Sequence, residues 1–371
     1  MQEQKSPSEC ADSPKRVPKC EMLLTQCAVD IPVLPVNWIW PGFLAAGKVH
    51  ILGGQPGVGK STLAMSLAAS VTTGRGWPDG HESEPGKVLI WSGEDDPGDT
   101  LIPRLLLSGA DLKKIHFVRG VYMPGGDTRF FDPAADTPML LQKLKEIGDV
   151  ILLVVDPIVS AITGDSHKNA EVRRGLQPLA DTAAACDCAL LGITHFSKGT
   201  QGFEPVERIT GSIAFAAVAR IVLVAAKKQG EGDDENKTRI FCRAKSNIEQ
   251  DDGGFEYTIE QVPLPENPDI INSVVKWGER LVGNAQYLLA KAEGKNKHGN
   301  DTGALAEAED FLREVLKDGP QPAKEVNEAV KDAGISRITL RRACKSLKVK
   351  PKRSGFGKGS KVLWSLPEPD D

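Results

Sequence analysis

One segment of the sequence combines glycine, lysine and serine at a spacing suited to binding a phosphate. Residues 54–61 read GQPGVGKS, which satisfies the pattern GxxxxGK[ST] in full. Glycines let backbone N–H groups turn inward around phosphate oxygens, and the start of the following helix adds its dipole. We therefore predict that Lys60 reaches the β- and γ-phosphates of ATP and that Ser61 binds Mg²⁺. The predicted nucleotide contacts are Gly54, Gln55, Pro56, Gly57, Val58, Gly59, Lys60, Ser61 and Thr62.

Two further polar residues end apolar runs and could serve the same phosphate. Asp156 ends the run over 150–155, so its carboxylate is the natural second ligand of the Mg²⁺ bound by Ser61. The alternative is that this aspartate, which precedes Pro157, only caps a turn. His195 ends the run over 189–194 and could sense the γ-phosphate, with a purely structural hydrogen-bonding role as the alternative.

Hydrolysis also needs a base that orients water. Glu94 follows a predicted strand over 87–92, and we predict it as the catalytic base, with Asp95 in reserve. Asp96 is instead predicted to cap the helix that begins at Pro97.

These residues need a scaffold that brings strand ends together. The apolar runs lack period-two alternation, which is typical of parallel strands covered on both faces, and they alternate with amphipathic helices. The pattern predicts an α/β fold with a mostly parallel sheet and helices on both faces. Strands are predicted over 48–53, 87–92, 115–119, 150–156 and 189–194, and helices near 59–73, 97–109, 137–147 and 169–185.

Composition narrows the class of protein. The chain has 371 residues, 46 Lys and Arg against 50 Asp and Glu, and a net charge of −4. Ten of the basic residues and no acidic one lie between Ser336 and Val362, an asymmetry typical of a nucleic-acid-binding appendage. The seven cysteines form no CxxC pair, which favours a reducing cytoplasmic compartment. The start lacks the apolar run of a secretory signal, and no stretch reaches the about 20 apolar residues of a membrane helix.

Breaks in the pattern suggest four parts. We expect a flexible tail over 1–36, an ATPase domain over 37–262, a linker with a short helix over 263–303 and a small domain over 304–371. Within the ATPase domain, 237–245 and 255–259 are predicted arms of a hairpin, and the aromatic-rich segment over 37–44 is expected to cover the core.

The C-terminal part is predicted to form a winged helix of three helices and a basic hairpin. Its third helix, begun by Ser336, would offer side chains to a DNA groove and its wing would contact phosphates. A protein-interaction domain with a solvated basic face is the alternative. The predicted DNA contacts are Arg337, Arg341, Arg342, Lys345, Arg353 and Lys358.

The order of these motifs resembles the RecA-type ATPases, and within them the RepA-like hexameric replicative helicases of plasmids and phages together with AAA-type prophage relatives. The resemblance covers roughly residues 37–260. It implies a homo-oligomer, a hexameric ring with ATP sites between subunits, in which Glu94 is the base, Asp156 the Walker B acid and His195 the sensor that links the γ-phosphate to DNA. It also implies an arginine finger from the neighbouring subunit, for which Arg220, Arg243 and Lys245 are candidates. Each of these could instead be a solvated charge at a strand end.

The loop between His195 and Thr210 is polar and glycine-rich. In ring ATPases of this type the equivalent loop lines a channel for single-stranded DNA, so Lys198 is the expected backbone contact, with an ordinary mobile loop as the alternative. The resulting hypothesis is a Mg²⁺-dependent ATPase that moves on DNA in the replication of a mobile element. The alternative is a nucleotide-switched DNA-binding or replication-initiation protein that unwinds nothing.

Overall fold

The computed structural model divides into two compact units, Met1–Val36 and Asn37–Asp371. In the first unit a short 3₁₀ helix spans Ala28–Asp30, and the side chains of Val33 and Leu34 are exposed. No helix in the described part of the chain is long and apolar enough to cross a membrane. The structure describes residues 23, 25–165, 168–197, 200, 202–209, 213–229, 238–294, 308–309, 311–317, 319–332, 337–347, 349–354 and 361–367.

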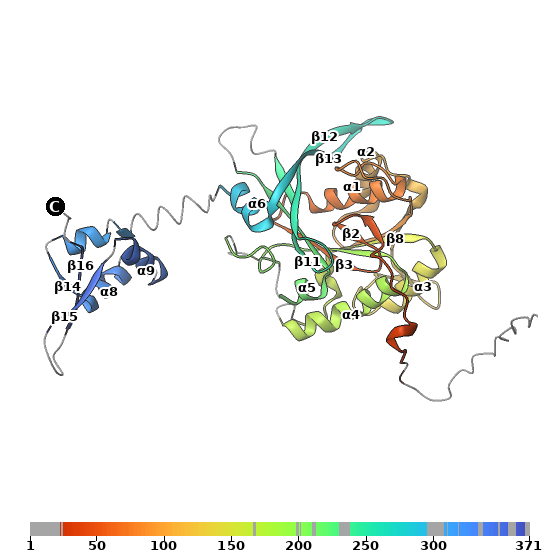
Figure 1. Ribbon diagram of the computed structural model, residues 1–371. Coiled ribbons are helices and arrows are strands. Elements are labelled where there is room, and N and C mark those ends of the chain that lie inside the picture. Colours follow the sequence, from red (N-terminus) through yellow and green to blue (C-terminus); the bar gives the residue numbers. More distant parts are fainter. Residues whose placement is uncertain are drawn as a thin grey trace, which may run out of the picture. The chain divides into compact units, whose positions relative to one another are not determined.

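A nine-stranded sheet dominates the second unit (Figure 1). Its order is β13-β12-β11-β10-β3-β9-β8-β4-β5, and the six strands from β10 to β5 are parallel. The prediction of a mostly parallel α/β sheet is confirmed, with antiparallel pairing only from β10 outward to β13 among the described strands of this sheet. The strands are β3 (Val49–Gly54), β4 (Lys87–Ser92), β5 (Ile115–Phe117), β8 (Val150–Asp156), β9 (Ala189–Ile193), β10 (Ile221–Lys227), β11 (Arg239–Ser246), β12 (Asp252–Leu264) and β13 (Asn267–Asn284).

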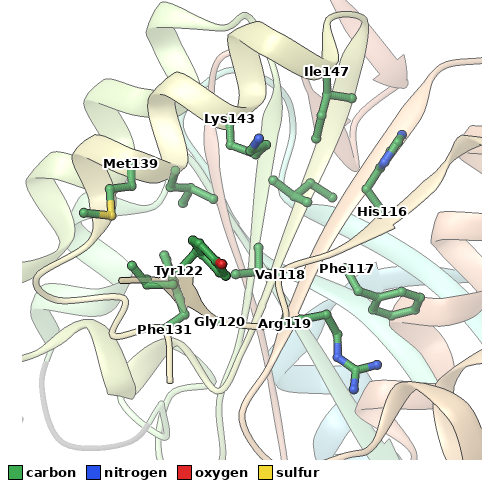
Figure 2. Close-up of a pocket in the computed structure, with 13 residues that line it drawn as sticks. His116, Phe117, Val118, Arg119, Gly120, Tyr122, Phe131, Met139, Lys143 and Ile147 are labelled. Atoms are coloured by element: carbon green, nitrogen blue, oxygen red, sulfur yellow. The ribbon is translucent and has the colours of Figure 1, made fainter. Parts of the chain in front are cut away.

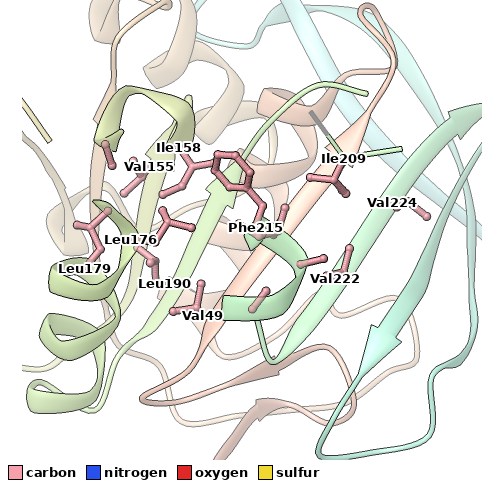
Figure 3. Packing of buried hydrophobic residues seen from close by; sticks show 14 of the residues in the cluster. Val49, Val155, Ile158, Leu176, Leu179, Leu190, Ile209, Phe215, Val222 and Val224 are labelled. Atoms are coloured by element: carbon pink, nitrogen blue, oxygen red, sulfur yellow. The ribbon is translucent and has the colours of Figure 1, made fainter. Parts of the chain in front are cut away.

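Helices cover both faces of the sheet, because successive side chains of its strands point to opposite faces. On β8, Leu153 and Val155 join one apolar cluster, while Leu152 and Val154 join the other. Figure 3 shows the first cluster, in which Phe215 packs among strand valines and helix leucines. This face carries α3 (Thr137–Ile147), α4 (Asn169–Ala185), α5 (Ile213–Val218) and α6 (Ala285–Ala292), and the other carries α1 (Lys60–Thr73) and α2 (Ile102–Leu107).

Strand order brings the polar motifs to one edge. Strand β9 lies between β3, which leads into the phosphate loop, and β8, which ends in Asp156. Because all three strands are parallel, their carboxyl ends meet at the same edge. Ser92, at the end of β4, pairs with Asp156, so the segment that carries Glu94 leaves the sheet there too.

The aromatic segment before β3 is buried. It forms the short strands β1 (Trp38–Trp40) and β2 (Leu44–Ala45), and Trp40 is fully buried. Its ring stacks on Phe43 at 4.0 Å between centroids and on Phe241 of β11 at 6.0 Å. Such stacking adds to the area term of burial, so this segment anchors the antiparallel end of the sheet.

Two parts of the structure differ from the expectations. Residues 263–284 were expected to start a linker, but they complete β12 and form β13, the longest strand of the sheet. Both ends of β13 are rich in polar residues, and only the short run Ser273–Val275 is buried. The sequence pattern of this segment therefore does not indicate a strand. The helix expected over 97–109 is a five-residue π-helix, Pro97–Leu101, followed by α2.

The C-terminal residues form a separate small core. Helical residues 311–316, α8 (Ala323–Asp332) and α9 (Arg337–Ser346) share an apolar cluster that includes Leu312, Val326 and Leu340. A three-stranded antiparallel sheet of order β14-β16-β15 accompanies them, with β14 at Gln321–Pro322, β15 at Lys350–Ser354 and β16 at Lys361–Ser365. Apart from the short β14, the elements follow the predicted order of helices and hairpin.

Candidate nucleotide site

The loop between β3 and α1 has the backbone that a phosphate loop requires. Gly57 and Gly59 have φ of +74° and +86°, a region that side chains other than glycine rarely adopt. Gly54 has no such angle, but a Cβ there would lie 2.5 Å from the carbonyl oxygen of Ala225. Gly59 is also the N-cap of α1, so the first backbone N–H groups of a 14-residue helix point at this loop.

The amino group of Lys60 lies at the centre of the site. It donates hydrogen bonds to the carbonyl oxygens of Gly54 and Gln55, both at 3.2 Å, and lies 3.0 Å from Nδ1 of His195. Lys60 is only 6% exposed, and burial lowers the pKa of its ammonium to about 8, against the attraction of Asp156. Because a buried ammonium has lost most of its hydration, a bound anion such as a phosphate stabilises its charged form strongly.

Ser61 and Asp156 fit a site for Mg²⁺. The Ser61 hydroxyl donates a 2.7 Å hydrogen bond to Oδ2 of Asp156, so the two oxygens lie side by side at the start of α1. Burial raises the pKa of the Asp156 carboxyl to about 6, while the hydrogen bond from Ser61 acts in the opposite direction. A buried carboxylate beside a hydroxyl suits a hard cation that keeps most of its ligands from water and phosphate.

The three acidic residues after β4, Glu94, Asp95 and Asp96, have different surroundings. Asp95 forms an ion pair with Arg104 at 2.9 Å. Asp96 accepts hydrogen bonds from the backbone N–H groups of Gly98 and Asp99, as expected of an N-cap. Glu94 is exposed, and its charge acts on the pKa values of nearby site residues, Lys60 among them. Of the three carboxylates, Glu94 is therefore the one that serves neither as a cap nor as a partner of Arg104.

His195 lies two residues beyond the end of β9, beside Lys60. Partial burial, followed by the charge of Lys60, lowers its pKa. The imidazole is therefore neutral at pH 7. Its Nδ1 accepts a hydrogen bond of 3.0 Å from the Lys60 ammonium. The structure thus brings together four of the predicted site residues: Lys60, Ser61, Asp156 and His195.

None of the three finger candidates lies at the carboxyl ends of β3, β8 and β9. Arg220 immediately precedes β10, and Arg243 and Lys245 pair with Leu223 and Val222 in the first half of that strand. Ile221 pairs with His50 at the start of β3, and Ala225 pairs with Gly54 at its end. Arg220 therefore lies about 16 Å along the sheet from its own phosphate loop, beyond the reach of an arginine side chain.

The candidates differ in how firmly they are held. Arg243 stacks on Phe43 at 4.6 Å and donates to the carbonyl oxygen of Asp252 at 2.8 Å. Lys245 donates to the carbonyl oxygens of Ala216, at 2.5 Å, and Ala219, at 3.3 Å. Arg220 is exposed, and its side chain makes no hydrogen bond or ion pair to a described residue.

The predicted DNA contacts are described only in part. Lys198 and Lys358 lie outside the described residues. Arg341 and Lys345 are exposed on α9. The backbone of Arg337 and Arg342 belongs to α9 and that of Arg353 to β15.

Sequence reasoning missed two groups that touch the phosphate loop. The Lys227 ammonium, at the end of β10, lies 3.7 Å from where a Cβ on Gly57 would be. The Tyr257 hydroxyl of β12 donates a 2.8 Å hydrogen bond to the carbonyl oxygen of Val58. Lys227 could have been found from its place at the end of the apolar run over 221–226, whereas no local signal pairs Tyr257 with Val58.

A cavity at the β5 edge is separate from this site (Figure 2). It holds about 560 Å³ between β5, the following loop and α3, with Phe131, Met139 and Ile147 in its lining. Its lining includes no residue of the phosphate loop and no carboxylate. The predicted phosphate-binding residues lie elsewhere, where β3, β8 and β9 end.

A family profile covers most of the candidate site. The sequence profile of a family described as AAA domain matches residues 24–201, which include the phosphate loop, Glu94, Asp156 and His195. Among solved structures, the chain is similar to a KaiC-like protein from Pyrococcus horikoshii OT3, at 18% identity and a TM-score of 0.44, over 66% of this chain and 100% of that one. No curated protein matches the chain. The mostly parallel sheet and the motifs are those of a P-loop ATPase domain.

Proposed function

We propose that this protein is a Mg²⁺-dependent ATP hydrolase that acts on DNA, and that it works as an oligomeric replicative helicase or translocase of a plasmid, phage or integrated element. The observation that carries the ATPase assignment is the convergence of Lys60, Ser61, Asp156 and His195 at one sheet edge. The replicative role rests on the resemblance of the motif order to RepA-like helicases and on the basic C-terminal part.

The site residues divide the work of hydrolysis between them. Bound Mg²⁺, held by Ser61 and Asp156, would neutralise charge on the phosphate oxygens. Lys60 stabilises the charge that develops as the γ-phosphoryl group transfers. Glu94 takes the proton of the attacking water, since it is exposed at this edge and not used as a cap or in the pair with Arg104.

His195 would connect the state of the nucleotide to the loop that follows it. Its Nδ1 accepts from Lys60, so the imidazole loses a partner whenever Lys60 turns toward a phosphate. The chain continues directly from His195 into the segment expected to contact single-stranded DNA. A change at the γ-phosphate thereby reaches the DNA contact through a single residue.

An assembly of several subunits completes the site. Because Arg220 lies out of reach of its own phosphate loop, it can serve a phosphate site only if that site belongs to a neighbour. Its exposed guanidinium, in contrast to the engaged side chains of Arg243 and Lys245, favours it as the arginine finger. The ring expected from the resemblance provides such a neighbour at every site.

The basic C-terminal part supports contact with duplex DNA. Three helical segments, a small antiparallel sheet and exposed Arg341 and Lys345 on α9 are consistent with a winged helix that reads a groove. We expect Arg341→Ala with Lys345→Ala to weaken duplex binding and to lower its salt dependence, since each lost phosphate contact reduces the number of counterions released.

The decisive experiment is the steady-state ATPase rate with and without single-stranded DNA, at low and moderate salt, with Lys60→Ala as the control that removes hydrolysis. Stimulation of about tenfold or more, equal to about 1.4 kcal/mol of barrier, supports a translocase. An unchanged rate with intact ATP binding supports the alternative of a nucleotide-switched DNA-binding protein. Hydrolysis retained in Lys60→Ala overturns the assigned site.

A further inference from the structure

A buried ion pair lies behind the nucleotide site and is not used by the proposed chemistry. The Arg208 guanidinium, 2% exposed, donates to the carboxylate of Glu293, which is 8% exposed. Nε of Arg208 has no hydrogen-bond partner among the described residues. Removing two charges from water costs several kcal/mol per ion, so a pair with an unsatisfied donor contributes little net stability. Such a pair needs another explanation than stability alone.

On one side, the pair reaches the nucleotide site through Phe196. The Arg208 guanidinium lies 4.5 Å from the centre of the Phe196 ring, and Phe196 directly follows His195. The backbone N–H of Phe196 donates a 3.1 Å hydrogen bond to the carbonyl oxygen of Gly54, the same oxygen that accepts from Lys60. Phe196 is thus fixed between the phosphate loop and Arg208.

On the other side, the pair reaches the last helix of the ATPase domain. Glu293 directly follows α6, and its backbone N–H donates to the carbonyl oxygen of Leu289 in that helix. Gln286, in the first turn of α6, donates to the carboxylate of Glu204. Helix α6 therefore holds the segment 204–208 at both of its ends, and the chain runs on from α6 toward the C-terminal part.

We propose that Arg208 and Glu293 are positioning residues that couple α6 to His195. Glu293 holds the Arg208 guanidinium against Phe196, and Phe196 holds His195 at the amino group of Lys60. A displacement of α6, such as the C-terminal part would cause on binding DNA, then moves the imidazole relative to the γ-phosphate. This inference rests on the proposed ATPase, in which His195 senses the γ-phosphate.

The test measures hydrolysis by the full-length chain in Glu293→Gln, His195→Ala and the double variant. We expect Glu293→Gln to lower kcat by about tenfold, because small displacements of a positioned group are costly. KM should change by less than about twofold, since uniform binding is untouched. The double variant should be no slower than His195→Ala, because both changes interrupt one connection. Arg208→Lys, which keeps the charge but loses the planar guanidinium over Phe196, should lower kcat as well.

The control is Asp136→Asn, which breaks the ion pair between this buried carboxylate and the exposed Arg129, outside the connection. It should lower the melting temperature but leave kcat unchanged. A second readout does not need hydrolysis: the imidazole ¹⁵N resonances of His195, assigned by their loss in His195→Ala, should shift in Glu293→Gln and stay in place in Asp136→Asn.

The outcomes separate this coupling from the proposed function. If the unmodified chain hydrolyses no ATP, the proposed function fails, and the His195 resonances alone then decide whether Glu293 positions the imidazole. Resonances and kcat unchanged in both Glu293→Gln and Arg208→Lys overturn the coupling. Losses in Glu293→Gln and His195→Ala that multiply in the double variant overturn it as well.

Discussion

Ser61 and Asp156 are 95 residues apart in the chain, yet their side chains share a 2.7 Å hydrogen bond. The strands that lead to them are not neighbours, because β9 lies between β3 and β8. The Ser61 hydroxyl, at the start of α1, nevertheless reaches the Asp156 carboxylate. His195, just beyond the intervening strand β9, lies against Lys60. The proposed metal ligands and the proposed sensor thus lie together at one edge of the sheet.

Replacing Asp156 by Asn should stabilise the protein in the absence of nucleotide and Mg²⁺. Burial raises the pKa of this carboxyl from 3.8 to about 6, so between these values the folded chain keeps a proton that the unfolded chain has lost. Stability therefore falls as the pH rises through this window. The variant, which lacks the charge, should exceed the parent by about 3 kcal/mol above pH 6, and the difference should vanish below about pH 4.

Urea unfolding of both proteins at pH 4 and pH 7.5 measures this difference. Asp136→Asn is the control of opposite sign, because the Arg129 guanidinium lowers the pKa of Asp136, whose stabilising contribution is lost as the pH falls. Asp156→Asn should also lose Mg²⁺-dependent hydrolysis. A variant less stable than the parent at pH 7.5 would contradict the argument.

Glu94→Gln should abolish hydrolysis and preserve ATP binding. The amide keeps the size of the side chain but cannot take a proton from water, and loss of a general base costs about a hundredfold or more in kcat. Asp96→Asn is the matched control two residues along the chain, because asparagine caps a helix as well as aspartate does. Single-turnover hydrolysis and the Kd for ATP separate the two effects. Equal losses in both variants would remove Glu94 from the role of base.

The sequence predicts the residues of the proposed phosphate site because each of its parts is local. Gly57, Gly59 and Lys60 lie within one short motif, and Asp156 and His195 each end an apolar run. Parallel strands then bring those ends to one edge whatever lies between them in the chain. The groups that support the site are different, because each depends on a contact between distant segments.

Arg208 illustrates this limit. Its buried pairing with Glu293 joins residues 85 positions apart, and nothing in the polar composition of its loop distinguishes it from a solvated arginine. Strand β13 was missed for a related reason: only its middle residues are buried, so its pattern resembles that of a linker.

Lys227→Ala should weaken ATP binding without changing kcat much. The Lys227 ammonium extends toward Gly57 from the end of β10, so it adds a cation beside the phosphate loop in both the ground state and the transition state. Because the side chain is exposed, the Kd for ATP should rise by only about three- to tenfold. Isothermal titration at two salt concentrations measures this, with the exposed Lys113 changed to Ala as the control. A fall in kcat at unchanged Kd would point to a role in transfer instead.

Arg220→Ala should abolish hydrolysis in a way that a neighbouring subunit can repair. Loss of an arginine finger costs about a thousandfold or more in kcat. If the finger acts across an interface, mixing this variant with Glu94→Gln rebuilds complete sites where an intact Glu94 meets an intact Arg220. In a random equal mixture about a quarter of the interfaces of a closed ring meet this condition, so activity should rise well above that of either variant alone.

The control is the same experiment with Arg173→Ala, which removes an exposed arginine of α4. This variant should hydrolyse ATP before it is mixed with Glu94→Gln, because Arg173 is not a finger candidate. Arg243→Ala should behave differently from Arg220→Ala. Its guanidinium packs on Phe43 and bonds to the backbone of Asp252, so its loss should lower the melting temperature of the isolated subunit. If the mixture of Arg220→Ala and Glu94→Gln stays as inactive as its parents while Arg243→Ala is rescued by Glu94→Gln, the finger is Arg243, and the contacts of that residue must open on assembly.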